Sequence, residues 1–383
     1  MKKVFISVGE ISADTYASYI VNALKDRYQF LGITGPKLLK TGVKSISTID
    51  DISVVGLTEV FSKYKKIKRV FKESVDAITD CDVVMVVDFP GFNIKLIKEA
   101  KKLRKKVIYF ISPQIWAWGY NRIYDIVKNT DLLISILPFE EDYYRPFIDE
   151  NFKFFYGGHP LIDIVKPKTD RNSFEDRLNI PKGRLLIGLL PGSRESEVKA
   201  LLPVMFESAK LLNNAIENSF FLIPATDNVL ETVIDISSKY HKLPHRVVKS
   251  SDLDFPSYEV MKHSYFSVIA SGTATLEASI IGNPFVLVYK VSPVTFFIGK
   301  RLVKIPFLGL PNIIAGKQIV VELLQSDFNP LNIANIALEY IHNKELYQKT
   351  KDQLAELKHK LGSEGALNRI VESIDNFLTQ SRL

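Results

Sequence analysis

Residues 83–93 have the sequence VVMVVDFPGFN, and this stretch decides the fold class. Its first five residues are apolar and mostly β-branched, which predicts a short strand buried on both faces, as in a parallel sheet. After the turn at Pro90-Gly91, an amphipathic pattern over 94–103 predicts a helix. A buried strand that is followed by a turn and a helix is the repeating unit of an α/β protein.

This unit recurs along the chain in two series. A polar stretch over 163–184 lies between the series and predicts a connector, and from about residue 330 the pattern is purely helical and charged. We therefore expect two doubly wound α/β domains that face each other. The first series has predicted strands at 4–8, 83–87, 107–111, 132–136 and 152–156, and the second has them at 185–190, 220–224, 265–270 and 285–289.

The composition is that of an ordinary globular protein. Hydrophobic residues make up 46% of the 383 residues and charged residues 24%, which excludes disordered, collagen-like and coiled-coil proteins. The single cysteine, Cys81, excludes a disulfide scaffold and a cysteine-based zinc site and fits a reducing compartment. We expect no signal peptide, because Glu10 interrupts the first apolar run, and no membrane-spanning helix, because no run of about 18 apolar residues occurs. The net charge of +7 favours anionic partners, such as nucleic acid, an anionic membrane surface or a phosphorylated substrate.

Two carboxylates follow predicted strands of the first series. Asp88 comes directly after the strand at 83–87, and Glu10 lies just beyond the end of the first strand. Ligands of doubly wound sheets bind beyond the carboxyl ends of the strands, so either side chain is placed to act as a general base. The structural alternative is that Asp88 caps the turn after it, and that Ser12 or Asp14 caps the helix after Glu10. Local sequence leaves both roles open.

Two turns of small residues follow strands of the second series. The first, PGSR at 191–194, exposes backbone N–H groups at the start of a helix, and Arg194 adds a planar cation that suits phosphate. The second, SGTATLE at 271–277, places Glu277 one turn inside a helix, where a carboxylate can accept both hydroxyls of a ribose. Together with the carboxylates of the first series, these turns predict a nucleotide-sugar donor in one half and an acceptor in the other, with a capping box as the alternative for the first turn. No G-x-G-x-x-G or Walker A pattern occurs.

The other distinctive segments are aromatic or basic. The loop SPQIWAWG at 112–119 holds both tryptophans, which suggests a wall of the binding site for a sugar or an acyl chain, although core packing is the default for tryptophan.

Over 57–72, apolar residues fall on one helical face and basic residues crowd the others, which is typical of an interfacial helix on anionic lipid or of a solvated face on a packed helix. A second apolar and basic run lies at 296–301. His159 stands alone, which favours a structural role, and no spacing of ligands predicts a metal site.

A set of motifs in a fixed order resembles those of the lipid-A-disaccharide synthases. The motifs are GEISAD at 9–14, SPQIWAW at 112–118, GHP at 158–160, LPGSR at 190–194, SGTATLE at 271–277 and LPNIIAG at 310–316. The resemblance covers nearly the whole chain, and its SPQIWAW segment is highly specific.

The resemblance implies the glycosyltransferase B architecture, in which two Rossmann-like doubly wound domains face each other across a cleft. Residues 1–165 would form the N-terminal domain, which takes the acceptor and faces the membrane. Residues 166–344 would form the C-terminal domain, which binds the UDP-sugar, and helices within 345–383 would pack back on the N-terminal domain.

The resemblance also implies an inverting hexosyltransferase of lipid A biosynthesis. The reaction joins UDP-2,3-diacylglucosamine to 2,3-diacylglucosamine 1-phosphate and gives a β-1,6-linked tetraacyl disaccharide 1-phosphate and UDP. Members are peripheral proteins on the cytoplasmic face of the inner membrane of Gram-negative bacteria, and they form homodimers with exchanged C-terminal segments. We expect no cofactor and no metal ion, an anionic membrane surface as a partner, and no nucleic acid.

Matched position by position, the resemblance assigns roles to single residues. Asp88 corresponds to the aspartate proposed as the base, with Glu10 in reserve, and Arg194 corresponds to the arginine near the diphosphate. The sequence departs from the family pattern where Ala13 replaces a glycine, which requires a negative φ, and where Gly91 replaces a common acidic residue. The expected UDP site comprises Gly192, Ser193, Ser271, Gly272, Thr273, Ala274, Glu277, Asn312, Glu322 and Gln325.

Other functions stay open at this point. A related transferase would move N-acetylglucosamine to a polyprenyl-linked acceptor and would use a donor without acyl chains. A non-catalytic protein would bind a nucleotide or a lipid without turnover. Nucleic-acid binding is the weakest alternative, because the basic residues cluster with large apolar ones on a helix rather than around a groove.

Overall fold

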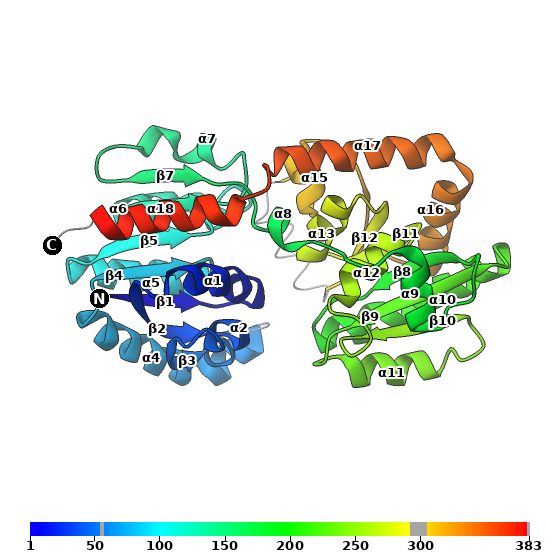
Figure 1. The fold of residues 1–383 in the computed structure, drawn as a ribbon, viewed down its shortest axis with the longest axis horizontal. Helices are drawn as coiled ribbons and strands as arrows, with labels where there is room; N and C mark the ends of the chain where they lie inside the picture. The colour runs from blue at the N-terminus through cyan, green and yellow to red at the C-terminus, as the bar shows by residue number, and fades with distance from the viewer. Residues whose placement is uncertain (54–56, 292–304, 381–383) are drawn as a thin grey trace. The chain divides into compact units, whose positions relative to one another are not determined.

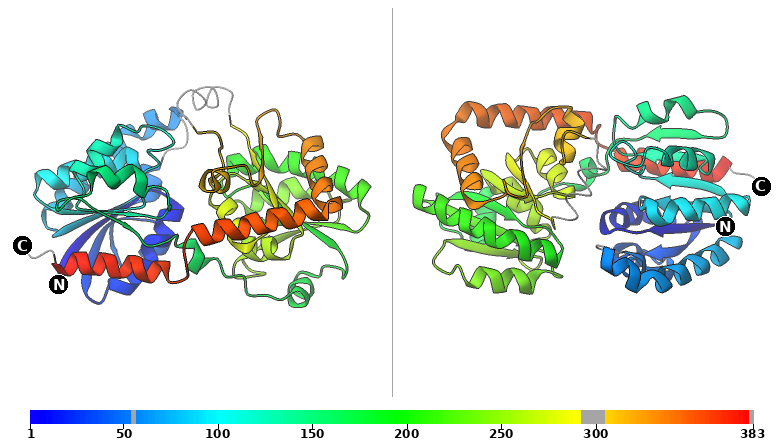
Figure 2. Two further views of the ribbon diagram at one scale, coloured as in Figure 1. Left: turned by 90° about the horizontal axis from the view of Figure 1, so that it is seen from above. Right: turned by 180° about the vertical axis from the view of Figure 1, so that it is seen from behind.

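The chain folds into two compact α/β units. The computed structural model describes residues 1–53, 57–291 and 305–380. The first unit comprises Met1–Asp163 and Leu361–Leu383, and the second comprises Ile164–Lys360 (Figures 1 and 2). Each unit has one parallel sheet with helices on both faces, which confirms the predicted fold class of two doubly wound domains.

The sheet of the first unit has seven parallel strands in the order β3-β2-β1-β4-β5-β6-β7. The sequence pattern predicted the strands that are buried on both faces, such as β4. It missed β2 and β3, which lie at one edge of the sheet and contain polar as well as apolar residues. The strands are β1 (Lys2–Val8), β2 (Tyr28–Thr34), β3 (Lys44–Thr48), β4 (Val83–Val87), β5 (Lys106–Phe110), β6 (Leu132–Ser135) and β7 (Lys153–Tyr156). The helices are α1 (Ile11–Leu24), α2 (Pro36–Leu39), α3 (Ile49–Ile52), α4 (Leu57–Thr79), α5 (Pro90–Lys102), α6 (Arg122–Lys128), α7 (Glu141–Tyr144), the 3₁₀ turn η1 (Arg145–Phe147) and α18 (Ala366–Gln380), and α8 (Leu161–Ile164) spans the division between the units.

The sheet of the second unit has six parallel strands in the order β10-β9-β8-β11-β12-β13. The strands β10 and β13, which the sequence pattern missed, lie at its two edges and are only partly buried. The strands are β8 (Leu185–Leu190), β9 (Ser219–Ala225), β10 (His245–Lys249), β11 (Phe266–Ala270), β12 (Phe285–Tyr289) and β13 (Val321–Leu324). The helices are α9 (Arg171–Leu178), α10 (Glu195–Ala215), α11 (Leu230–Ser238), α12 (Pro256–His263), α13 (Thr273–Ile281), α15 (Leu310–Ala315), α16 (Pro330–His342) and α17 (Lys344–Lys360).

The topology brings the expected site residues together in pairs. In the first sheet the strand order reverses between β1 and β4, so the segments that begin at Gly9 and Asp88 leave neighbouring strands at the same edge. In the second sheet the reversal lies between β8 and β11, which places the turns at 191–194 and 271–277 side by side. Such reversals are the points at which doubly wound sheets bind ligands.

The last helix, α18, returns to the first unit and packs on α1 (Figure 1). Asp375 of α18 forms an ion pair with Arg27 (2.6 Å) and accepts a hydrogen bond from the Tyr28 hydroxyl (2.9 Å). The preceding helix, α17, belongs to the second unit, because it packs on α13, α15 and α16. The chain therefore returns to the first unit at Leu361 rather than at residue 345.

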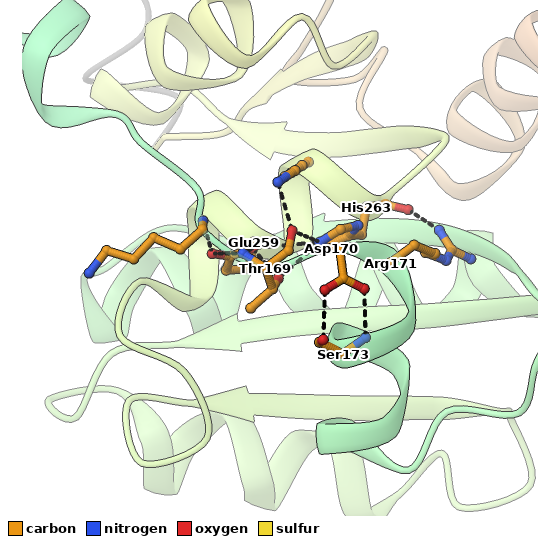
Figure 3. Close-up of polar contacts among 8 residues, drawn as sticks. Thr169, Asp170, Arg171, Ser173, Glu259 and His263 are labelled. Atoms are coloured by element: carbon orange, nitrogen blue, oxygen red, sulfur yellow. Dashed lines mark hydrogen bonds and ion pairs between the residues drawn. The ribbon is translucent and has the colours of Figure 1, made fainter.

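A buried carboxyl group fixes the segment that begins the second unit (Figure 3). Glu259 of α12 accepts hydrogen bonds from the backbone N–H groups of Lys168 and Thr169 and from the Thr169 hydroxyl. Beside it, Nε2 of His263 lies 3.0 Å from the same hydroxyl, and Arg171 donates to the His263 carbonyl oxygen. Glu259 is only 3% exposed, so water cannot replace these bonds, and they tie the predicted connector to α12.

We expect Glu259→Ala to lower the free energy of unfolding of the second unit by about 2–4 kcal/mol, because it leaves buried backbone donors without acceptors. Urea denaturation followed by circular dichroism measures the change. Asp235→Ala removes an exposed carboxylate of α11 in the same unit and, as the matched control, should change the value by less than about 0.5 kcal/mol. A loss below about 1 kcal/mol for Glu259→Ala would show that these contacts do not hold the segment.

Candidate active site

The turn after β4 holds Asp88 in an unusual backbone conformation. Asp88 and Phe89 both have positive φ, 48° and 51°, which is strained for a bulky residue such as Phe89. The Asn93 amide compensates, because its Nδ2 donates to the Asp88 carbonyl oxygen (2.8 Å) and its Oδ1 accepts from the Ser7 hydroxyl of β1 (2.7 Å). The Tyr109 hydroxyl of β5 donates to the same Asp88 carbonyl oxygen (3.0 Å). Side chains from both neighbouring strands thus hold this turn.

The Asp88 carboxyl group is not used as a helix cap. Helix α5 begins after Phe89, which is its N-cap residue and makes no side-chain capping hydrogen bond. The Asp88 carboxyl group accepts from the backbone N–H of Phe89, so the capping alternative keeps this one contact with the turn. Burial, and then the negative charge of Glu10, raise the pKa of Asp88 to about 7, while the backbone N–H of Phe89 acts in the opposite direction. A carboxyl group that titrates near neutral pH suits a general base, because its ionised form is populated and still binds a proton readily.

Glu10 lies at the neighbouring strand end. Its side chain is exposed and does not cap α1. The preceding Gly9 packs against the Phe89 ring, so the ends of the two strands touch. A Cβ at position 9 would lie 2.1 Å from the Phe89 ring, which leaves room only for glycine. Asp14 instead accepts hydrogen bonds from three backbone N–H groups at the start of α2, which makes it a structural residue. Ala13 lies within α1 and has no positive φ, as its replacement of a glycine requires.

The two tryptophans of the loop at 112–119 differ in environment. Trp116 is partly buried, and its indole Nε1 donates to the Glu140 carboxyl group (3.0 Å). Trp118 is 44% exposed, and the Arg122 guanidinium stacks on its ring 3.8 Å from the centroid. Trp116 therefore packs as tryptophans do by default, whereas Trp118 presents its ring to solvent.

The PGSR turn follows β8 and leads into α10. Gly192 has a φ of 104°, and a Cβ at this position would clash with the Glu197 carboxylate. Arg194 precedes the helix, and no side chain caps its first turn, so the alternative of a capping box is wrong. The exposed Arg194 guanidinium donates to Glu197 (3.0 Å), and the Ser193 carbonyl oxygen accepts from Asn228 (2.7 Å). The turn therefore offers backbone N–H groups and a cation to an anionic ligand.

The SGTATLE turn lies beside it, at the end of β11. Gly272 is exposed and precedes α13, and the Thr275 hydroxyl donates back to its carbonyl oxygen (2.8 Å). Glu277 accepts a hydrogen bond from the Tyr258 hydroxyl of α12 (3.2 Å), and its carboxylate can accept further hydrogen bonds from a diol. The other expected residues of this turn are partly exposed: Ser271, Thr273 and Ala274.

Two of the expected UDP-site residues, Asn312 and Glu322, brace the backbone around α15. Asn312 is fully buried, and its Oδ1 accepts from two backbone N–H groups just before β13 while its Nδ2 donates to Glu322 (2.7 Å). Glu322 also accepts from two backbone N–H groups just before α15. Gln325 follows β13 with a φ of 53°, and its Nε2 is buried without a partner in the described part of the chain. A contact of these residues with UDP stays a prediction.

His159 has the structural role that its isolation favours. It is buried, its Nδ1 accepts from the backbone N–H of Leu161 (3.1 Å), and the Tyr16 ring meets it edge-on. Burial lowers the pKa of His159 to about 3, so the ring stays neutral. Within residues 1–53, 57–291 and 305–380, no group of three or more His, Cys, Asp and Glu side chains is arranged to hold a metal ion.

The second half of the basic helix α4 turns its apolar side toward the protein. Ile67 and Phe71 pack against the core of the first unit, and Phe71 meets Phe92 with ring centroids 5.4 Å apart. This packing favours the solvated-face alternative for that half, because protein covers its apolar stripe while the lysines stay exposed. The side chains at 57–63 and the run at 296–301 lie outside the described residues. None of the helices described is long and apolar enough to cross a membrane. The exposed lysines of this half are Lys65, Lys66, Lys68 and Lys72, of which Lys66 forms an ion pair with Asp51 (2.5 Å).

Sequence reasoning missed the side chains that hold this site. Asn93, Tyr109 and Glu140 make the hydrogen bonds around the Asp88 turn and the Trp116 loop. Glu140 follows β6, so the rule that identifies Asp88, a polar side chain beyond a strand end, also applies to it. Asn93 and Tyr109 could not be identified in this way, because one lies inside a helix and the other inside a strand.

We expect Asp88→Asn to stabilise the fold at pH 8 by up to about 4 kcal/mol, because the folded protein raises the pKa of the native carboxyl group to about 7 and each pKa unit corresponds to about 1.4 kcal/mol. In the unfolded chain this group titrates near pH 3.9, so the wild type loses stability relative to the variant between about pH 4 and about pH 7 and the difference is constant above. Asparagine tolerates a positive φ as aspartate does, so the backbone strain is unchanged. Urea unfolding of both proteins across this pH range measures the difference, and equal stabilities at pH 8 would contradict the raised pKa.

Solved structures share the fold of this chain. The UDP-GlcNAc 2-epimerase from Neisseria meningitidis bound to UDP-GlcNAc has a TM-score of 0.66 at 14% identity, over 98% of this chain and 100% of that one. The calicheamicin glycosyltransferase CalG4 has a TM-score of 0.62 at 12% identity, over 100% of both chains. At these identities the likeness shows the fold alone.

Curated relatives and a family model show the family. The chain is 55% identical to the lipid-A-disaccharide synthase of Sulfurihydrogenibium sp. over 100% of both chains. It is 52% identical to that of Persephonella marina over 98% of both chains, and 37% identical to that of Aquifex aeolicus over 97% of this chain and 98% of that one. The family model described as lipid-A-disaccharide synthetase matches residues 4–372. The chain therefore belongs to the lipid-A-disaccharide synthase family.

Proposed function

We propose that the chain condenses UDP-2,3-diacylglucosamine with 2,3-diacylglucosamine 1-phosphate into a β-1,6-linked tetraacyl disaccharide 1-phosphate and releases UDP. Its family, whose members are glycosyltransferases of lipid A biosynthesis, supports this reaction. The structural observation that carries the proposal is the Asp88 carboxyl group, which stands at the reversal point of the first sheet with its pKa raised to about 7.

Asp88 acts as the general base of this reaction. Its carboxylate takes the proton from the 6-hydroxyl of the acceptor while that oxygen forms a bond to C1 of the donor sugar. The bond from C1 to the β-phosphate oxygen breaks, and its electron pair leaves with UDP. The attack comes from the face opposite UDP, so the configuration at C1 inverts. Glu10 is the second candidate for the base, because it follows the adjacent strand.

The second unit binds the UDP part of the donor. The N–H groups at the start of α10 and the Arg194 guanidinium stabilise the negative charge that grows on the β-phosphate as the sugar leaves. Arg194 uses one nitrogen for Glu197, so its other N–H groups remain for phosphate oxygens. Glu277 accepts the ribose hydroxyls. With this cation at the leaving group, we expect the reaction to need no metal ion.

We further propose that the chain is a peripheral protein on the cytoplasmic face of the bacterial inner membrane. Both substrates carry acyl chains, so the enzyme must reach them at a bilayer surface. The exposed lysines of α4 support attraction to anionic lipid. The family resemblance also supports a homodimer with exchanged C-terminal segments.

We expect Asp88→Asn to reduce UDP release by a factor on the order of 10²–10⁴, because the acceptor hydroxyl loses its base. The assay incubates the purified protein with both acylated substrates in detergent and EDTA and measures UDP. The affinity for UDP, measured by calorimetry, should stay unchanged, since Asp88 lies in the first unit. Asp125→Asn alters a half-exposed aspartate of the same unit and should keep the wild-type rate.

Other outcomes of this assay would overturn the proposal. A folded wild-type protein that releases no UDP, with or without Mg²⁺, would contradict the proposed reaction. Turnover of unacylated UDP-N-acetylglucosamine with a polyprenyl-linked acceptor would instead support the related transferase, and UDP binding without any turnover would support a binding protein. Activity that EDTA abolishes and Mg²⁺ restores would contradict metal independence.

We expect kcat/KM to rise with pH and to reach half of its maximum near pH 7, because Asp88 must be ionised to accept the proton. Glu10→Gln should move this midpoint to lower pH, since it removes the negative charge that disfavours ionisation of Asp88. A wild-type midpoint near about pH 4, the ordinary range of an aspartate, would contradict the proposal. Loss of activity in Glu10→Gln together with an active Asp88→Asn would assign the base to Glu10.

A further inference from the structure

Glu140 is a buried carboxyl group near the candidate active site that the proposed reaction does not use. It follows β6 and is 1% exposed. Its Oε1 accepts a hydrogen bond from Nε1 of Trp116 at 3.0 Å, and its Oε2 lies within hydrogen-bond distance of the Ser135 hydroxyl. The neighbouring Phe139 ring meets the Trp116 ring edge to face, with centroids 5.2 Å apart. The segment after β6 therefore holds this indole through a polar bond and a ring contact.

The hydrogen bonds around Ser135 indicate that the Glu140 carboxyl group carries a proton. Ser135 Oγ lies 3.0 Å from the Leu137 carbonyl oxygen and accepts from the Leu137 backbone N–H at 3.1 Å. A hydroxyl has one proton, so it cannot donate to both this carbonyl and Glu140, and a carboxylic acid supplies the missing donor. Burial agrees with this, because it raises the pKa of Glu140 to about 8 against the hydrogen bonds that lower it.

The loop that carries Trp116 begins next to the Asp88 turn. The two segments leave the paired strands β4 and β5, and the Asp88 backbone N–H donates to the Phe110 carbonyl oxygen (3.0 Å). Ile111 then has a φ of 65°, which is strained for a β-branched residue and persists only where the surroundings impose it. The loop is held at one end by the hydrogen bond between the Ser112 and Tyr144 hydroxyls (2.9 Å) and at the other by the indole.

We propose that Glu140 is a positioning residue for the glycosyl transfer, which clamps the Trp116 indole and thereby fixes the 112–118 loop beside the Asp88 turn. Its effect on the rate rests on the proposed function, whereas its effect on the indole does not. The carboxyl group acts in its neutral form, so a glutamine replaces it: the amide oxygen accepts from Trp116, and the amide N–H donates to Ser135. An alanine removes both contacts.

Tryptophan fluorescence tests the clamp without substrate. The chain has two tryptophans, so Trp118→Phe leaves Trp116 as the sole reporter. In that background, Glu140→Ala should shift the emission to the red and increase quenching by acrylamide, because the indole loses its partner and is reached by solvent. Glu140→Gln should keep the original spectrum. Glu141→Ala, at the half-exposed neighbouring position, is the matched control and should also keep it.

Activity then tests the consequence for the reaction, in the chain with both tryptophans. Glu140→Ala should lower kcat by a factor on the order of 10², the effect of a displacement of about 1 Å at an active site, and should leave the affinity for UDP unchanged. Glu140→Gln should restore kcat to near the wild-type value. Trp116→Phe removes the indole N–H, and its loss should not add to that of Glu140→Ala, because both changes remove the same interaction.

Three results would overturn the positioning role. One is an unchanged Trp116 spectrum in Glu140→Ala, and another is an unchanged kcat per folded molecule. The third is a folded but inactive Glu140→Gln with the original spectrum, since the proton or charge of Glu140 would then take part in the chemistry. If Glu140→Ala does not fold, Trp116→Phe is used in its place. A kcat of Trp116→Phe equal to that of the wild type would then contradict the proposal. Absence of UDP release from the wild type would refute the proposed function alone, because the fluorescence comparison would still decide whether Glu140 holds the indole.

Discussion

Asn93 joins the ends of two strands at the point where the first sheet reverses its order. It accepts from the Ser7 hydroxyl of β1 and donates to the Asp88 carbonyl oxygen, and so it holds the turn after β4 in its positive φ. Side chains of Asn93 and Tyr109 bind the backbone of this turn. The N-cap residue of α5 is Phe89 rather than Asp88. Partial burial of the Asp88 carboxyl group and the charge of Glu10 then bring its titration near neutral pH, which is the property that the proposed reaction requires of a base.

The two units use one topology for opposite charges. At the reversal of the first sheet stand the carboxyl groups of Glu10 and Asp88, and at the reversal of the second stand Arg194 and the uncapped N-terminus of α10. The proposed glycosyl transfer requires a base for the attacking hydroxyl and positive charge for the departing phosphate. In each unit the parallel sheet places the residues that follow two adjacent strands at one edge, which is where these candidate groups lie.

The sequence pattern predicted the features that depend on residues adjacent in the sequence. It did not predict the features that depend on side chains from distant parts of the chain. We could predict the buried strand β4, Asp88 after it and the small-residue turns, because runs of apolar residues and of turn residues are visible in consecutive positions of the sequence. The positive φ of Asp88 was not, because side chains from β1, α5 and β5 impose it. For the same reason the bracing role of Asn312 was missed, and the apolar face of α4 could not be assigned to core or bilayer, since both present hydrocarbon to a helix.

The titration of the Asp88 carboxyl group itself tests this account most directly. Carbon-13 NMR of protein labelled at the aspartate carboxyl carbons, with Asp88→Asn to assign the resonance, follows its ionisation without substrate or turnover. We expect a midpoint near pH 7, as burial and the neighbouring charge of Glu10 require. A midpoint near about pH 3.9, the value of a solvated aspartate, would contradict the claim that the fold prepares Asp88 as a base.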